Sequence, residues 1–157
     1  VDDLGEVLVH GVALKPGHPV ALGIVEDTPI VMLPGYPVAA IVNAVQFLRP
    51  VLKYVGHLPD DPPPTTEAEL ARKIPSEPGV RTFARVKVDD DGRGNDGDDL
   101  GGDDDASSVP TATPTRASGS GVLSSVALAD GWVVVPEGRE GFDVGETVTV
   151  EHWEWSA

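Results

Sequence analysis

The chain has 157 residues, a formal net charge of −15 at pH 7 and no Cys. This length fits one good core or two small ones, since domains commonly contain roughly 100 to 150 residues. Binding to nucleic acid or to an anionic membrane needs a basic face that neutralises phosphates, and so acidic a chain is not expected to have one. We therefore expect neither nucleic acid nor an anionic membrane surface as a partner. Without Cys, disulfides and thiolate metal sites are excluded.

Asp is more frequent than Glu in this chain, with 16 Asp and 10 Glu, and there are only four Lys. Such a surface suits high salt, where the Debye length shrinks to about 3 Å and self-repulsion is screened. The composition predicts a halophilic, archaeal source, although an ordinary solvated acidic shell explains the same charge. No apolar run reaches about 18 residues and no basic segment precedes one, so we expect a cytoplasmic protein without a membrane span.

Residues 1–57 are expected to form the end of an α/β layer, because short β-branched and apolar runs lead into a helical segment. Pro37 suits the first turn of that helix, and Pro50 predicts a kink or break late in it. The expected elements are strands over 6–14, 20–25 and 29–33, a hairpin loop over 26–28 and a helix over 37–55.

A Pro-rich linker over 58–66 is expected to separate this layer from a small all-β barrel or sandwich domain over 67–157. The stretch "RTFARVKV" alternates apolar and polar residues, which is typical of a half-buried strand. Further strand candidates lie over 67–74, 111–117, 122–128, 132–136 and 146–153.

Residues 89–108 contain nine Asp and five Gly with almost no apolar side chains. A helix–loop–helix calcium site needs ligands at fixed offsets and a bidentate Glu at its end, and this tract has no Glu. We therefore expect an acidic disordered loop and no metal ligands in it.

Two turns are candidates for binding an anion. The turn Pro34-Gly35-Tyr36-Pro37 leads from a strand into a helix, where backbone N–H groups and the helix dipole favour negative charge. Lys15 ends a neighbouring strand and could present its ammonium there. Read from the residues alone, a purely structural turn and a plain surface charge at Lys15 are the more common alternatives.

Other catalytic arrangements find no support in the sequence. The four His residues have no metal-ligand spacing, and the Ser-Gly pairs at 118–121 have no hydrolase elbow with plausible partners. No catalytic residue is assigned.

The order Lys-Pro-Gly-x-Pro, short hairpin, Leu-Pro-Gly-x-Pro-Val at a helix start closely resembles the molybdopterin-binding domain of the molybdopterin molybdenumtransferases, the MoeA and gephyrin E-domain family. Downstream, "RTFARVKV", "SGSGVLSSVALADGWVVVP" and "FDVGETVTV" resemble the C-terminal β-barrel of the same family. The resemblance implies a fold in which the end of a three-layer α/β domain is followed by a small barrel.

The resemblance also implies a function in molybdenum cofactor biosynthesis. The family cleaves adenylylated molybdopterin in a step that needs a divalent metal such as Mg²⁺, releases AMP and places molybdate on the dithiolene. The residues that the resemblance assigns to substrate and oxyanion binding are Lys15, Pro34, Gly35, Pro37, Arg85 and Ser120. Since Arg85 and Ser120 belong to the barrel, the site is expected between domains and, in this family, between the subunits of a homodimer.

Two positions depart from the family pattern. His18 stands where a second Lys is frequent, and Tyr36 replaces the usual Asn, so both are possible site residues with altered properties. The family's Gly-Gly-x-Ser-x-Gly segment and the acidic residues that handle the metal are absent from this sequence. We therefore expect the Mg²⁺ ligands outside this chain, and expect the chain to act as part of a longer or split enzyme.

The alternatives are a non-catalytic molybdopterin-binding module and a truncated remnant. Molybdate and tungstate have the same charge and nearly the same shape, so the sequence does not distinguish them.

Overall fold

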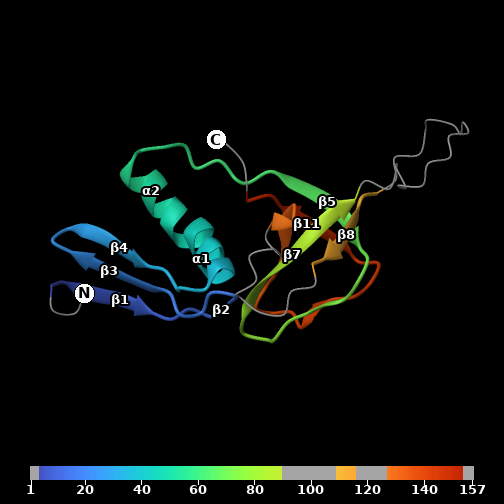
Figure 1. Cartoon of the computed structure of the whole chain (residues 1–157), viewed down its shortest axis with the longest axis horizontal. Coiled ribbons are helices and arrows are strands. Elements are labelled where there is room, and N and C mark those ends of the chain that lie inside the picture. The colour runs from blue at the N-terminus through green and yellow to red at the C-terminus, as the bar shows by residue number, and fades with distance from the viewer. Residues whose placement is uncertain (1–3, 90–108, 116–126, 154–157) are drawn as a thin grey trace, which may run out of the picture.

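The structure is a computed structural model that describes residues 4–89, 109–115 and 127–153. Figure 1 shows a three-stranded sheet beside a long helix, and next to them a small barrel to which the chain passes over the linker. The N-terminal sheet has the order β1-β3-β4, and the barrel strands form a larger sheet.

The N-terminal sheet consists of β1 (Glu6–His10), β3 (Ala21–Val25) and β4 (Thr28–Met32), all antiparallel to their neighbours. Val25 pairs with Thr28, so the β3–β4 turn contains only Glu26 and Asp27. Both have positive φ, 47° and 64°, which is the backbone of a type I′ hairpin and matches the twist of the strands.

A continuous helix follows the sheet and lies beside it (Figure 1). It comprises α1 (Pro37–Asn43), a π-helical turn (Ala44–Leu48) and α2 (Arg49–Val55). The amide of Arg49 donates to the carbonyl of Ala44. This wider turn makes room for Pro50, whose ring would clash with a carbonyl of a regular helix, so the expected kink becomes a local π-helical turn without a break.

By length and composition alone, the 19 residues of Pro37–Val55 could cross a membrane, a property that core helices of soluble proteins share. In this fold, Val38, Ala39 and Val42 are buried, whereas Leu52 and Tyr54 on its last turns are exposed.

The second half forms a closed ring of five strands in the order β7-β8-β5-β11-β9, closed by the pairing of β9 with β7. A short pair lies beside the ring. The elements are β5 (Thr65–Leu70), β6 (Ile74–Pro75), β7 (Arg81–Asp89), β8 (Thr111–Pro114), β9 (Gly131–Val135), β10 (Gly141–Phe142) and β11 (Thr147–Glu151).

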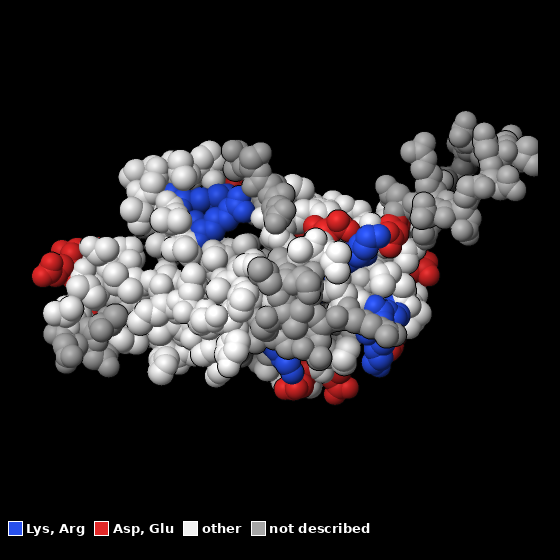
Figure 2. Space-filling view, viewed as in Figure 1, with Lys and Arg blue, Asp and Glu red and all other residues white. Residues whose placement is uncertain are grey.

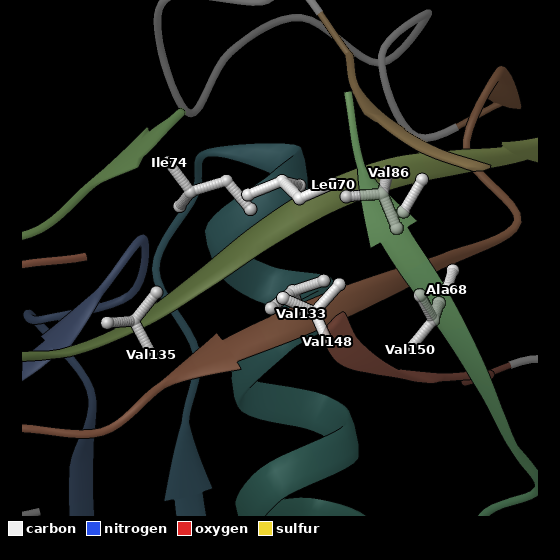
Figure 3. Close-up of a cluster of buried hydrophobic side chains, with 9 residues drawn as sticks. Ala68, Leu70, Ile74, Val86, Val133, Val135, Val148 and Val150 are labelled. Atoms are coloured by element: carbon white, nitrogen blue, oxygen red, sulfur yellow. The ribbon is translucent and has the colours of Figure 1, made fainter. Parts of the chain in front are cut away.

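The barrel interior is filled by small and branched side chains that alternate along its strands (Figure 3). Strand β7 shows the alternation directly. Ala84, Val86 and Val88 belong to the barrel core, whereas Phe83 packs outside it, against the helix. Arg85 therefore lies on the outer face of the barrel, on the same side of the strand as Phe83.

The two halves meet in one sheet and one apolar cluster. Strand β2 (Leu14–Lys15) runs parallel to β7, with Leu14 opposite Arg81 and Lys15 opposite Thr82. A second cluster of Leu14, Val42, Phe83, Trp132 and Trp153 lies at the junction. Phe83 and Trp132 meet edge to face at 5.2 Å between ring centroids, a favoured aromatic geometry.

The expected order of an α/β layer followed by a small β-barrel is confirmed. The boundaries at 1–57, 58–66 and 67–157 stay a prediction, although β5 already begins at Thr65, inside the expected linker. The expected strand over 67–74 is divided into β5 and β6. The acidic loop at 89–108 lies, except for its first residue, outside the described residues.

Candidate functional site

The two turns that the sequence singles out lie at the same end of the β3–β4 hairpin. Ala21, the first residue of β3, pairs with Met32, the last residue of β4. The turn over 15–19 therefore enters the hairpin where the turn over 33–37 leaves it.

The first turn is anchored to the helix and to the chain that precedes it. Asn43, which is fully buried, donates from Nδ2 to the carbonyl of Gly17 at 2.9 Å. Gly17 has a φ of 129°, and an added Cβ would lie 2.7 Å from that amide nitrogen. The His18 ring bonds through Nδ1 to the carbonyl of Val12 at 2.6 Å, while the amide of Val12 donates to the carbonyl of His18. These contacts fix the turn that follows Lys15.

Lys15 is exposed and paired with a carboxylate of the barrel. Its Nζ lies 3.1 Å from Oε1 of Glu77, and both side chains are well exposed. Glu77 belongs to the connection between β6 and β7, whose Ser76 hydroxyl lies 2.7 Å from that of Thr82. The pairing of β2 with β7 is thus what brings Lys15 to the barrel.

Arg85 lines a cavity of about 210 Å³ on the outer face of the barrel. Among the described residues that line it, two are basic, Arg85 and Lys73, two carry hydroxyls, Thr82 and Thr115, and none is acidic. Pro16, directly after Lys15, contributes to the same wall. The whole chain has a net charge of −15, yet this cavity presents cations and hydroxyls, which are groups that bind oxyanions.

The strand pairing explains how the cavity is held. The amide of Thr115 donates to the carbonyl of Arg85 at 2.9 Å and continues the contact of β8 with β7. Arg72 donates to the carbonyl of Pro114 next to it. Partial burial lowers the pKa of Arg85 from its ordinary value, because desolvation disfavours the charged form. An Arg stays protonated after such a change, so the cavity keeps its positive charge.

The sequence-predicted site residues are only partly brought together. Lys15 adjoins the Arg85 cavity through Pro16, while Pro34, Gly35 and Pro37 are not among its lining residues. Tyr36 begins the helix with its ring largely exposed, and Ser120 lies outside the described residues.

Three lining residues of this cavity were not identified as site residues from the sequence: Lys73, Thr82 and Thr115. They come from three separate segments, and only the register of β6, β7 and β8 places them around Arg85. A single Lys before an apolar residue gives no sequence signal of its own.

A larger cavity of about 370 Å³ lies between α2, the linker and the barrel. Figure 2 shows basic side chains gathered on the helix beside a hollow, and the basic residues of α2 are Arg49 and Lys53. Asp60, Asp61 and Glu151 line the same cavity, and Lys53 lies 3.8 Å from the carboxylate of Asp60. This mixture of charges favours the smaller cavity as the oxyanion site.

Within the described residues, no group of three or more His, Asp or Glu side chains is placed to hold a metal ion.

Two family models match the chain. The first, described as a probable molybdopterin binding domain, covers residues 2–54. The second, described as the MoeA C-terminal region (domain IV), covers residues 103–153. The two matches fall on the α/β part and on the barrel.

Individual relatives match along almost the whole chain. A Methanocaldococcus jannaschii protein named for molybdopterin biosynthesis is 37% identical over 150 residues, which are 96% of this chain and 31% of the relative. The molybdopterin molybdenumtransferase of Haemophilus influenzae is 28% identical over 96% of this chain and 34% of its own length.

The solved structure of a MoeA protein from Pyrococcus horikosii matches with a TM-score of 0.70 and 33% identity, over 99% of this chain and 34% of that one. The chain thus spans about a third of the length of these relatives. Since both halves match in the order found in these proteins, the chain belongs to the MoeA family of molybdopterin molybdenumtransferases and corresponds to its C-terminal portion.

Proposed function

We propose that this chain acts in molybdenum cofactor biosynthesis as part of a longer or split enzyme that inserts molybdate into adenylylated molybdopterin and releases AMP. The observation that carries the proposal is the cavity around Arg85, whose lining in the described part of the chain includes two cations and two hydroxyls and no carboxylate. In this role Arg85 offers two parallel N–H groups to oxygens of the oxyanion, and Lys15 supplies further positive charge from the adjoining turn.

The turn over 34–37 would complete the site from a second subunit. Within one chain Pro34, Gly35 and Pro37 do not line the Arg85 cavity, whereas Pro16 does. A homodimer in which the helix-start turn of one subunit faces Arg85 of the other reconciles the two sets of predicted residues. His18 and Tyr36 would then modify the pocket, and Ser120 would contribute from the barrel.

The exposed apolar surface favours a larger assembly over an independent module. Leu8 on β1 and Leu52 and Val55 on α2 are each more than half exposed, as is Leu58 after the helix. Large apolar side chains left exposed in number can mark surfaces that another element covers. In this proposal, the rest of the longer or split cytoplasmic enzyme covers the exposed apolar side chains. That part of the enzyme would also supply the acidic residues that bind Mg²⁺.

Titration calorimetry with molybdate tests the oxyanion site. We expect Arg85→Gln to weaken binding about ten- to a hundredfold, as is typical for removing a charged hydrogen-bond donor, and the more exposed Lys15→Ala to weaken it about two- to fivefold. Lys87→Gln, also on β7 but not lining the cavity, is the matched control. Unchanged affinity in Arg85→Gln would refute the proposed site.

The catalytic role has its own assay. This chain, adenylylated molybdopterin, molybdate and Mg²⁺ are combined with and without the part of the Pyrococcus horikosii protein that precedes the matched region, and AMP is measured. Release only in the combined sample supports an incomplete enzyme. Molybdopterin binding without AMP release in either sample favours the alternative of a non-catalytic binding module, and no binding at all favours a remnant.

A further inference from the structure

Lys73 is the second cation of the Arg85 cavity, and strand pairing determines its position. Lys73 directly precedes β6, which pairs with β10 so that Ile74 faces Phe142 and Pro75 faces Gly141. Continuing this register by one residue places Lys73 opposite Asp143. The two side chains meet there, with Nζ of Lys73 at 2.8 Å from Oδ1 of Asp143.

The two cations of the cavity differ in their exposure to solvent. Arg85 is part of a closed strand ring and is partly buried, so its guanidinium is held in place. Lys73 is 62% exposed in its side chain, and Asp143 is 76% exposed. An exposed ion pair of this kind contributes little free energy, because water and salt screen it. The ammonium of Lys73 can therefore exchange Asp143 for another anion at small cost.

We propose that Lys73 binds the tetrahedral oxyanion together with Arg85, and that Asp143 is the carboxylate which the oxyanion displaces. This inference rests on the proposed function, since it concerns the same cavity. Molybdate carries two negative charges, and two cations on different walls of a cavity neutralise a dianion better than Arg85 alone. Asp143 would then set the affinity, because it competes with the oxyanion for Lys73.

Lys87 provides a matched control on the same barrel. It is an exposed lysine that also pairs with a carboxylate, that of Asp89, but it does not line the cavity. Its neutralisation changes the net charge of the chain as much as that of Lys73 does. If the two variants differ in molybdate affinity, the difference is therefore due to the position of the lysine and not to the net charge of the chain.

The test is titration calorimetry of the full chain with molybdate, repeated with sulfate, at a fixed ionic strength of about 0.15 M where distant charges are screened. We expect Lys73→Gln to weaken molybdate binding about five- to tenfold and Lys73→Arg to restore most of it. Asp143→Asn is expected to strengthen binding about two- to fivefold, the size of one exposed ion pair. Lys87→Gln and Asp89→Asn should each change affinity less than about twofold.

Each failure has a different meaning. Unchanged affinity in Lys73→Gln, with a large loss in Arg85→Gln, would overturn the role of Lys73 and leave the proposed function intact. Equal losses in Lys73→Gln and Lys87→Gln would also overturn it, because they would show a general effect of charge. If Arg85→Gln binds like the unmodified chain, the proposed function fails and this inference fails with it. Thermal unfolding of each variant confirms that a loss of binding is not a loss of fold.

Discussion

Gly17 is the residue at which the anchoring of the Lys15 turn can be tested most directly. Its φ of 129° disfavours any residue with a side chain, and an added Cβ would lie 2.7 Å from Nδ2 of Asn43 and 2.8 Å from Cδ2 of Leu14. Backbone strain of this kind costs about 1–3 kcal/mol, and overpacking in a filled site typically costs about 1–3 kcal/mol. Since partial relaxation relieves some of both, we expect Gly17→Ala to lower the free energy of unfolding by about 2–4 kcal/mol.

Urea unfolding followed by Trp fluorescence measures this loss, because Trp132 and Trp153 lie in the cluster at the junction. With an m value of about 2 kcal/mol per molar urea, in the middle of the usual range, the midpoint should fall by about 1–2 M. Molybdate binding should weaken in the same variant, since the turn that carries Lys15 would shift relative to the barrel.

Two other glycines separate the two contributions. An added Cβ at Gly79 meets nothing within 4 Å although its φ is 84°, so Gly79→Ala isolates backbone strain. At Gly35 no neighbour lies within 4 Å either, and its φ is not positive, so Gly35→Ala should change stability by less than about 0.5 kcal/mol. If Gly17→Ala were no more destabilising than Gly79→Ala, the contact with Asn43 would not hold the turn, and this reasoning would be wrong.

The remaining predictions concern the barrel. Leu70 is fully buried, so Leu70→Ala should cost about 2–5 kcal/mol in urea unfolding; a cost as small as that of Leu52→Ala, on the exposed face of α2, would contradict the packing. The pKa of Glu137 is lowered by a backbone hydrogen bond and by Arg81, so its carboxylate stabilises the fold above its ordinary pKa of 4.5, and this contribution is lost as the pH falls through its lower folded value. Glu137→Gln should therefore lose less stability between neutral and acid pH than the unmodified chain; identical acid profiles for Glu137→Gln and the unmodified chain would argue against the pair.

Local patterns determined much of the fold. The alternation in "RTFARVKV" predicted a strand over 81–88, and β7 is found over Arg81–Asp89. The apolar runs after Lys15 and before Pro34 predicted a hairpin, and β3 pairs with β4 along its whole length. These features depend on neighbours in sequence, which is why residue order alone reveals them. The helix over 37–55 was predicted as well, although its π-helical turn was not.

The site depended on contacts between distant segments. Lys15 and Glu77 are 62 residues apart, and Lys73 and Asp143 are 70 apart. Nothing in the sequence distinguishes Asn43 from other residues of its helix. Only the fold buries its side chain and places it against Gly17.

The sequence by itself determined the order of the longer strands and the helix, the family, and the candidate cations Lys15 and Arg85. Only the tertiary structure decided that Lys15 faces Glu77, that Lys73 joins Arg85, and that the turn over 34–37 does not line their cavity. The physical reason is that strand register and ring closure are set by the packing of the whole barrel and by its pairing with β2. Periodicity predicts which face of a strand is buried, but not which distant strand lies beside it.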